Sequence, residues 1–510
     1  MTDPRVRAAY AEGAGIYRIV PAAVAIPGNT DDVVALVRHA ADSRLTLIPR
    51  GAGSGMPGGN VGSGVIVDLS SGFSQLVVDP QTRIARAGAS VTWAKVNEAA
   101  KPHGLRLPPD PSSGAFATSG GMVATNAAGA RTVRYGSVRR WVEALEVVGA
   151  DGMVRTVRRG EDAKLDLSTE NRKLITDHFP KTRKNSSGYA LDHFAATGDE
   201  IDLLVGSEGT LGIVTQVQWR LDPIPPDVAG AALGFADLDA MIDAVPYLLS
   251  LQPSALELLD SSLLRFVPEA PPVACLLLVE FEREAGGGAA ARGVVGDAVR
   301  GLKESVAHVE TAVDRAGLER LWSVRRLASP ALARLPAQQR SLQVIEDGCV
   351  PLDALGAYIA GLRTAAERRG IPIVIFGHAG DGHIHVNALP DTTAEGWRGA
   401  LHELFAEVTD LLWGLGGVPS GEHGVGRLRA GILERFYGKD VMDLFRAVKR
   451  AYDPLSLLNP GVIIPATDWS PVAALKVGAD AAVIPEDIAT RLRDVERSAA
   501  WATPKLDLAH

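Results

Sequence analysis

A glycine-dense loop between two short apolar strands constrains the fold of this chain more than any other segment. The loop 51–64 (GAGSGMPGGNVGSG) follows a strand predicted at 45–49 and precedes one predicted at 65–70, with no helix between them. A Rossmann loop must open a helix whose N-terminus faces the pyrophosphate, and a P-loop must end in Lys followed by Ser or Thr. Neither pattern fits here. Backbone N–H groups of a tight turn can still bind a phosphate, so the loop predicts either an anion site or a plain flexible turn.

Two further segments rich in small residues lie in the same half of the chain, at 108–142 and 206–216. Long runs of Gly, Ala, Ser and Thr without apolar periodicity make poor cores, but they offer many backbone donors to an extended polar ligand. Between them the sequence predicts a hairpin that turns at Asp151 and Gly152. Three such segments together favour an N-terminal domain that wraps a ligand.

Clustered prolines at 221–227 (LDPIPPD) predict a domain boundary, because proline ends regular structure and stiffens a connection. Beyond it, helices such as 237–251 alternate with strands such as 274–282, which predicts an α+β second domain. After Pro465, apolar residues at helical spacing predict one amphipathic helix docked on the surface, with Ile488, Leu492 and Val495 on its apolar side.

Composition restricts the function. A chain of 510 residues with 46% hydrophobic and 22% charged residues is typical of globular proteins with two or more domains. A net charge of -8 without a basic block argues against nucleic-acid binding. Cys275 and Cys349 are too few for a disulfide framework or for an iron–sulfur cluster held by four cysteines. No segment approaches a secretory signal or the ~20 apolar residues of a membrane span, so we expect no integral membrane segment and a cytoplasmic location, free or peripheral to a membrane.

Histidines in glycine-rich surroundings carry the strongest chemical signal. The segment 377–387 (GHAGDGHIHVN) predicts a hairpin between two strands. In such a hairpin His383, His385 and Asn387 share one face, because side chains alternate along a strand. His378 then lies diagonally across from His385, so two imidazoles can converge on one ion.

A second glycine-flanked loop, 420–426 (SGEHGVG), supplies Glu422 and His423 and is expected to open a helix near Arg427. Two histidines and one carboxylate leave positions open for substrate, which fits catalytic zinc or manganese and also suits non-haem iron. Neighbouring residues cannot both bind one ion without strain. We therefore assign Glu422 to the metal and His423 to proton abstraction, since a base must stay neutral and uncoordinated. His383 is expected beside the metal ligands or facing the substrate.

Arg325 and Arg326 follow Trp322 on a helix predicted at 318–332. A surface position is the common fate of such arginines. A guanidinium is also what a carboxylate substrate requires, because its planar fork makes two parallel charge-assisted hydrogen bonds. Arg325 is therefore a candidate carboxylate clamp, with a plain surface charge as the alternative.

In combination, these motifs resemble a known family. PRGAGSGMPGGN, ATSGGMVATNAAGARTVRYG, KNSSGYAL and GSEGTLGIVT, in this order, resemble the FAD-binding domain of the vanillyl-alcohol oxidase or p-cresol methylhydroxylase type. GHAGDGHIHVN, SGEHGVG and DPLSLLNPGVIIP resemble the C-terminal domain of FAD-linked D-2-hydroxy acid dehydrogenases, the family of D-lactate dehydrogenase, the glycolate oxidase FAD subunit and D-2-hydroxyglutarate dehydrogenase. The resemblance covers residues 16–465.

The resemblance implies an α+β fold class with a vanillyl-alcohol oxidase or p-cresol methylhydroxylase-type FAD-binding domain and an FAD-linked oxidase C-terminal region. The implied parts are an FAD-binding domain at 16–222, an α+β substrate (cap) domain at 227–420, a segment at 421–465 that closes on the flavin, and a tail at 466–510 with one amphipathic helix.

By the same resemblance the glycine loops hold FAD non-covalently. The implied contacts are Arg50, Gly51, Ala52, Gly53, Ser54, Gly55, Pro109, Thr118, Ser119, Gly120, Gly121, Ala124, Thr125, Asn126, Gly206, Glu208, Gly209, Gly212, Ile213 and Asn459. The implied ligands of a divalent zinc or manganese ion are His378, His385 and Glu422. The implied catalytic residues are His423 as the base, Arg325 as the carboxylate clamp and Asn387, which helps to orient the substrate.

The implied activity is oxidation of a small, D-lactate-like D-2-hydroxy acid to the 2-oxo acid. His423 removes the hydroxyl proton beside the metal, and the C2 hydrogen passes to the flavin as hydride. Electrons then go to a separate acceptor: an electron-transfer flavoprotein, a cytochrome, a quinone or an iron–sulfur protein. An alternative is an FAD subunit within a multi-subunit, glycolate oxidase-like electron-transfer complex, and the metal donors alone would also permit a non-haem iron oxygenase. The oligomeric state stays open, with a homodimer as one option.

Two departures from the family pattern narrow these expectations. The D-2-hydroxyglutarate enzymes carry a lysine for the second carboxylate in the strand where this chain has Val344, Ile345 and Glu346, so a five-carbon diacid is less favoured. Family members often have asparagine at the position of His383. In addition, the chain lacks the cysteines of the iron–sulfur segment found in some bacterial relatives, so its electrons must leave through a separate partner.

Overall fold

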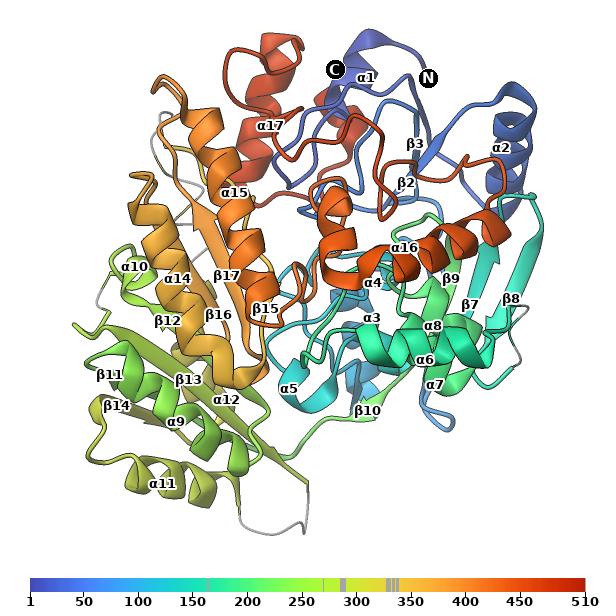
Figure 1. Cartoon of the computed structure of the whole chain (residues 1–510). Coiled ribbons are helices and arrows are strands. Elements are labelled where there is room, and N and C mark those ends of the chain that lie inside the picture. The colour runs from blue at the N-terminus through green and yellow to red at the C-terminus, as the bar shows by residue number, and fades with distance from the viewer. Residues whose placement is uncertain are drawn as a thin grey trace.

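The computed structural model describes residues 1–509 except 162, 164, 269, 285–289, 327–331, 333, 334 and 336–338. Within this part of the chain, an N-terminal half and a middle segment built on a large sheet lie side by side (Figure 1). The C-terminal segment returns from the large sheet to the N-terminal half. No helix in the described ranges is both long and apolar enough to cross a membrane.

A small parallel sheet holds the first glycine loop. Its strands, in spatial order, are β1 (Ala23–Ala25), β3 (Val65–Asp68) and β2 (Leu47–Arg50). Helix α2 (Thr30–Ser43) connects β1 to β2, and it begins where the Asn29 side chain accepts a hydrogen bond from the N–H of Asp32. The loop 51–64 joins β2 to β3 without a helix, as the sequence predicts.

A five-stranded antiparallel sheet completes the N-terminal half. Its order is β4 (Leu76–Asp79), β5 (Ile84–Gly88), β9 (Ile213–Arg220), β7 (Val142–Val148) and β8 (Val154–Arg158). The hairpin of β7 and β8 turns through Gly152 at a φ of 70°, which confirms the predicted turn. The helices of this half are α3 (Trp93–Ala100), α4 (Ser119–Thr125), α5 (Thr132–Tyr135), α6 (Thr169–His178), α7 (Leu191–Thr197) and α8 (Glu200–Leu204).

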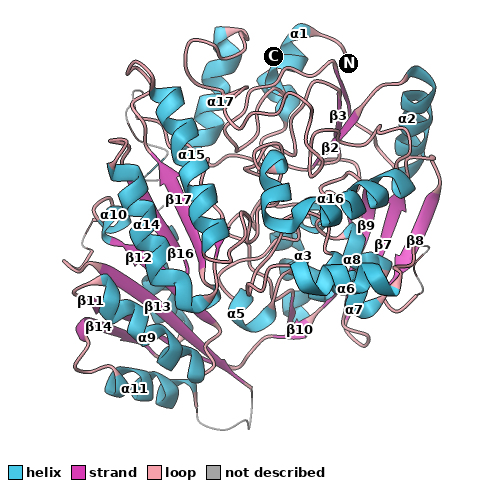
Figure 2. Cartoon of the chain, viewed as in Figure 1, coloured by secondary structure: helices cyan, strands magenta, loops and turns pink. Residues whose placement is uncertain are grey.

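The middle segment forms a seven-stranded antiparallel sheet with helices on both faces (Figure 2). Its order is β14 (Val306–Ala312), β11 (Asp227–Phe235), β13 (Cys275–Arg283), β12 (Ala255–Asp260), β16 (Ile373–His378), β17 (His383–Ala388) and β15 (Gly348–Cys349). One face packs on α9 (Leu238–Ser250), α11 (Ala291–Gly301), α14 (Leu355–Glu367) and α15 (Trp397–Gly414). The other face packs on α10 (Ser261–Leu264) and α12 (Arg315–Arg326). Burial on both faces explains why its central strands are apolar runs rather than alternating ones.

The start of the helix predicted in the C-terminal segment is wrong. Helix α16 begins at Leu433 and ends at Tyr452, so the helix expected near Arg427 starts later. The side chains of Arg427 and Arg429 bind the carbonyls of Pro460 and Gly424 in an irregular stretch that ends in a short 3-10 turn.

The tail packs on the N-terminal sheet. Helix α17 (Glu486–Ser498) buries Ile488, Leu492 and Val495, as predicted, in one cluster with residues of α1 (Pro4–Ala9) and of β1, β2 and β3. The helix is therefore part of a shared core.

Candidate active site

The hairpin of β16 and β17 sets the positions of the histidines. In its register His378 lies opposite His383, so His385 is diagonal to His378, as the two-residue period predicts. Gly382 closes the turn at a φ of 68°, and a Cβ there would approach the carbonyl oxygen of Val350 to 2.2 Å. Only glycine satisfies both conditions.

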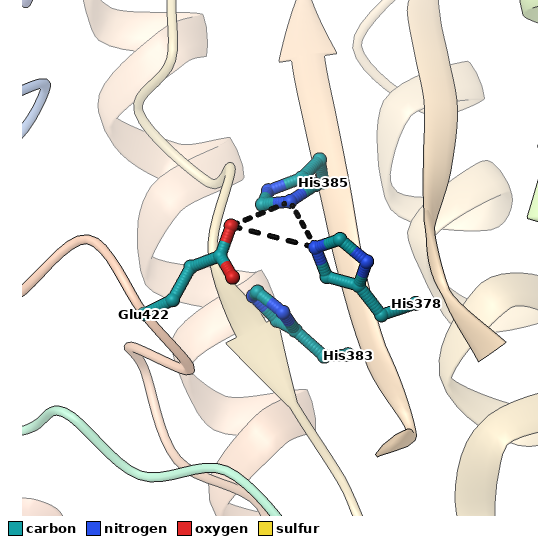
Figure 3. A group of neighbouring side chains, drawn as sticks. All are labelled: His378, His383, His385 and Glu422. Atoms are coloured by element: carbon teal, nitrogen blue, oxygen red, sulfur yellow. Dashed lines mark hydrogen bonds and ion pairs between the residues drawn. The ribbon is translucent and has the colours of Figure 1, made fainter. Parts of the chain in front are cut away.

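Three side-chain atoms meet in a small triangle (Figure 3). Nε2 of His378 and Nε2 of His385 lie 3.3 Å apart, and Oε1 of Glu422 lies 3.4 Å from the first and 3.2 Å from the second. Nitrogen and oxygen ligands of a tetrahedral zinc ion, at ~2.0–2.2 Å from the metal, are about 3.3–3.6 Å from one another. The three predicted ligands therefore have the spacing that one small cation requires.

Glu422 is fixed from its other side by a buried lysine. Nζ of Lys184 lies 3.2 Å from Oε2 of Glu422 and 3.5 Å from Oδ2 of Asp381. Burial alone would favour the neutral acid, but Lys184 and His378 lower the pKa of Glu422 well below its usual value. Lys184 belongs to the motif KNSSGYAL, but its contact with Glu422 could not be predicted from the sequence.

Glu257 supports the triangle from behind. This fully buried carboxylate on β12 bonds Nδ1 of His378 with one oxygen and accepts a hydrogen bond from Nε of Arg325, at 3.2 Å, with the other. Burial opposes its charge, yet His378 and Arg325 lower the pKa of Glu257 to about 2. A carboxylate on the far nitrogen of the ring is typical of metal-binding histidines. Glu257 was not predicted from the sequence; the only signal was an acid inside the apolar run 255–259.

His423 faces the triangle with one nitrogen and an acidic pair with the other. Its Nε2 lies 3.5 Å from Oε1 of Glu422, and its Nδ1 lies 2.7 Å from Oε2 of Glu346. Although burial disfavours the charged ring, Glu346 and Asp347 raise the pKa of His423 to about 10. A nearby cation would lower this pKa again, because like charges disfavour the charged form.

Arg325 points inward and Arg326 does not. The Arg325 side chain is 14% exposed and its guanidinium carbon lies 4.5 Å from the ring centre of Phe376. The Arg326 side chain is 57% exposed and pairs with Glu319. Glu257 contacts both Arg325 and His378 and so links Arg325 to the triangle. Arg325 is therefore not a plain surface charge. The predicted helix residues 327–331 lie outside the described residues.

Asn387 is buried at the end of the row that begins with His383 and His385. Its Oδ1 accepts a hydrogen bond of 2.9 Å from the hydroxyl of Ser341. This contact fixes the orientation of the amide, whose Nδ2 remains a potential donor.

The three segments of small residues line one cavity. The predicted FAD contacts along it are Arg50, Gly51, Ala52, Gly53, Ser54, Gly55, Thr118, Gly120, Gly121, Ala124, Thr125, Glu208, Gly209, Gly212 and Ile213. Glu422 and His423 line the same cavity, so it adjoins the triangle. The guanidinium of Arg50 turns away and donates to the carbonyls of Tyr10 and Glu12.

Comparison with known proteins identifies the family. The profile described as "FAD linked oxidases, C-terminal domain" matches residues 224–463, and the profile described as "FAD binding domain" matches residues 21–158. D-lactate dehydrogenase of Archaeoglobus fulgidus is 32% identical, over 86% of this chain and 90% of the relative. The chain belongs to the FAD-linked oxidase family.

Other relatives agree with this assignment. Glycolate oxidase subunit GlcD of Bacillus subtilis is 30% identical to this FAD-linked oxidase, over 87% of the chain and 89% of the relative. D-2-hydroxyglutarate dehydrogenase of Escherichia coli is 28% identical, over 88% of the chain but 49% of the relative. The predicted family, its FAD cofactor and its oxidoreductase activity are thereby confirmed, and the oxygenase alternative is set aside.

A solved structure supports the fold. An alkyldihydroxyacetonephosphate synthase superposes with a TM-score of 0.59 at 17% identity, over 86% of this FAD-linked oxidase and 76% of that chain. The predicted fold class, an FAD-binding domain combined with an FAD-linked oxidase C-terminal domain, is confirmed.

Five predicted FAD contacts of the oxidase lie outside the cavity lining: Pro109, Ser119, Asn126, Gly206 and Asn459. Residues 111–113 line the cavity in the segment of Pro109. Ser119 is fully buried, and Asn126 ends α4 in the left-handed conformation. The N–H of Gly206 bonds the carbonyl of Val123, and Nδ2 of Asn459 donates to the carbonyls of Gly59 and Glu208. Gly206 and Asn459 thereby hold the loops that carry the lining.

Glu208 joins two distant parts of the oxidase at the cavity wall. Its carboxylate accepts hydrogen bonds from the N–H of Val425 at 2.7 Å and of Gly426 at 2.9 Å. Burial raises the pKa of Glu208 to about 7 despite these bonds. The GSEG loop is thereby fastened to the segment that carries Glu422.

We expect Glu208→Gln to remove a pH-dependent loss of stability. An acid whose pKa is raised by folding favours the folded state most below its unfolded pKa of ~4.3. That contribution is lost as the pH rises through the folded pKa of about 7. At ~1.4 kcal/mol per pKa unit, the wild-type holoprotein should lose about 3 kcal/mol relative to the variant between about pH 4 and pH 8. Denaturant unfolding at several pH values measures this loss, and a constant difference would contradict it.

Proposed function

We propose that this FAD-linked oxidase oxidises a small D-2-hydroxy acid, of the D-lactate type, to the 2-oxo acid with one divalent cation, zinc or manganese. The observation that carries the proposal is the triangle of His378, His385 and Glu422, in which Glu422 lines the FAD cavity, with Arg325 behind the triangle. When bound, FAD supplies the two-electron acceptor and the cation supplies Lewis-acid polarisation of the 2-hydroxyl.

The protein side chains have distinct tasks in this proposal. Arg325 holds the substrate carboxylate, since a guanidinium fork that binds Glu257 through Nε still presents its two terminal nitrogens. His423 takes the hydroxyl proton at Nε2 while Glu346 holds its Nδ1. Asn387 orients the substrate through its amide. A bound 2-hydroxy acid is thereby held at both its carboxylate and its hydroxyl, which fixes the C2–H bond toward the flavin.

A diacid substrate is less favoured. In the neighbourhood where the D-2-hydroxyglutarate enzymes resembled by this chain carry a lysine, Val344 and Ile345 are buried apolar residues. Glu346 is committed to Arg429, at 2.6 Å, and to His423. Residues 344–346 therefore offer no cation to a second carboxylate.

The FAD-linked oxidase passes its electrons to a separate acceptor in this proposal. GlcD, which is named as a glycolate oxidase subunit and which this chain matches over 89% of its length, motivates the alternative that the chain acts inside a multi-subunit complex. In that case the same site would turn over only with its partner subunits.

Anaerobic reduction of the flavin tests the proposal. D-lactate, glycolate, D-2-hydroxyglutarate and larger D-2-hydroxy acids are added to the isolated holoprotein, and the loss of yellow flavin absorbance is followed. We expect reduction by D-lactate-like acids, with L-lactate as the matched control that leaves the flavin oxidised. If no D-2-hydroxy acid reduces the flavin, the stand-alone enzyme is refuted, and reduction restored by partner subunits would favour the complex.

A further inference from the structure

His383 is the member of the histidine row whose role is unassigned. It is fully buried on β17, and its Nε2 lies 2.8 Å from Oδ1 of Asp347. Its Nδ1 is buried and has no hydrogen-bond partner among the residues that the structure describes. An unpaired buried polar atom costs ~1–3 kcal/mol, so such an atom calls for an explanation.

Asp347 determines which nitrogen of His383 carries the proton. The carboxylate of Asp347 already accepts hydrogen bonds from the hydroxyl of Ser420, at 2.5 Å, and from the N–H of His423, at 2.9 Å. It is therefore an acceptor toward His383 as well, and Nε2 donates. In the neutral imidazole this leaves a lone pair on Nδ1.

The three histidines of the hairpin share one arrangement. His378 is held at Nδ1 by the carboxylate of Glu257, and Nδ1 of His385 lies 3.2 Å from the carbonyl oxygen of Glu346. His383 is held at Nε2 by Asp347. A metal-binding imidazole is held at its far nitrogen in this way, which fixes the ring and directs the other nitrogen at the ion.

The rings also converge in space. One nitrogen of His383 lies within 4.8 Å of a ligand atom of each of His378, His385 and Glu422. Figure 3 shows the three imidazoles and the carboxylate around a common central space. His383 therefore belongs to the same group of candidate ligand atoms as the triangle.

We propose that His383, through Nδ1, is a fourth protein ligand of the divalent cation bound by His378, His385 and Glu422. This inference rests on the cation of the proposed function and extends it. Three imidazoles and one carboxylate favour zinc over manganese, because imidazole suits zinc whereas manganese prefers oxygen ligands. The substrate hydroxyl would then be a fifth ligand, a coordination number that catalytic zinc can reach.

X-ray absorption of the zinc-loaded holoprotein tests the inference directly, since it counts imidazole ligands. We expect three in the wild type and two in His383→Asn, whose amide can still donate to Asp347 but has no imidazole lone pair. Zinc affinity should fall by ~10- to 100-fold or more in this variant. The FAD content, read from visible absorbance, should stay unchanged and would show that the variant is folded.

The control is His402→Asn, because His402 is exposed on α15 and should change neither the ligand count nor the affinity. Two imidazoles in the wild type, or an unchanged zinc affinity in His383→Asn, would overturn the inference. If a wild-type protein with two imidazoles is still reduced by a D-2-hydroxy acid, the proposed function survives without the fourth ligand. A holoprotein that binds no zinc would overturn this inference together with the metal dependence of the proposed function.

Discussion

His385→Ala will release the divalent cation and stop flavin reduction by the substrate. Nε2 of His385 lies 3.3 Å from Nε2 of His378 and 3.2 Å from Oε1 of Glu422, so its removal opens one corner of the triangle. Loss of Lewis-acid stabilisation of several kcal/mol corresponds to a rate of flavin reduction lower by ~10³-fold. His385 is absent from the cavity lining, so we expect FAD to remain bound.

Two measurements check this expectation. Elemental analysis of the purified variant gives its metal content, and stopped-flow absorbance gives the rate of flavin reduction by D-lactate. The matched control is His402→Ala, because His402 is an exposed histidine on α15. A His385→Ala protein that keeps its cation, or that is reduced at the wild-type rate, would show that His385 is not a ligand.

His423→Ala should separate proton abstraction from metal and FAD binding. We expect the variant to keep both cofactors and to reduce its flavin ~10²- to 10⁴-fold more slowly, the usual contribution of a general base. Glu346, the acidic partner of His423, still has a partner in this variant, because it pairs with Arg429 at 2.6 Å. Loss of the imidazole should therefore leave the loop in place.

The same stopped-flow assay measures the effect of His423→Ala, with FAD absorbance and metal content taken on one sample. The decisive quantity is the limiting rate at saturating substrate, because a base acts on the chemical step rather than on binding. An unchanged limiting rate falsifies the assignment of His423. Loss of the cation together with the rate would instead make His423 a ligand.

The local parts of the site could be predicted and the distant ones could not. The diagonal placement of His378 and His385 follows from strand periodicity, because one short turn connects their strands. Glu257 contacts His378 across 121 residues and Lys184 contacts Glu422 across 238 residues. Neither pairing leaves a periodic signal, since it depends on how sheets and loops pack in three dimensions.

The FAD cavity shows the same division. Glycine-rich segments predict a ligand site that is lined by backbone. Most of the predicted FAD contacts do line the cavity. Asn126 and Asn459 lie in the predicted motifs, but in the structure they shape the loops and do not line the cavity. A motif indicates which segment of the chain lies near the ligand, whereas the direction of each side chain depends on the residues that it contacts. The helix expected near Arg427 was wrong for a related reason, because two arginines bind backbone carbonyls there.

The hydrogen bonds from Val425 and Gly426 to Glu208 affect the order in which the protein folds and binds FAD during its synthesis. The N-terminal half, with all three glycine-rich segments, emerges first and can begin to fold. Its cavity nevertheless lacks one wall until residues more than 200 positions later are made, since Glu208 and Val425 are separated by 217 residues. Stable binding of the flavin therefore has to wait until Val425 has been synthesised.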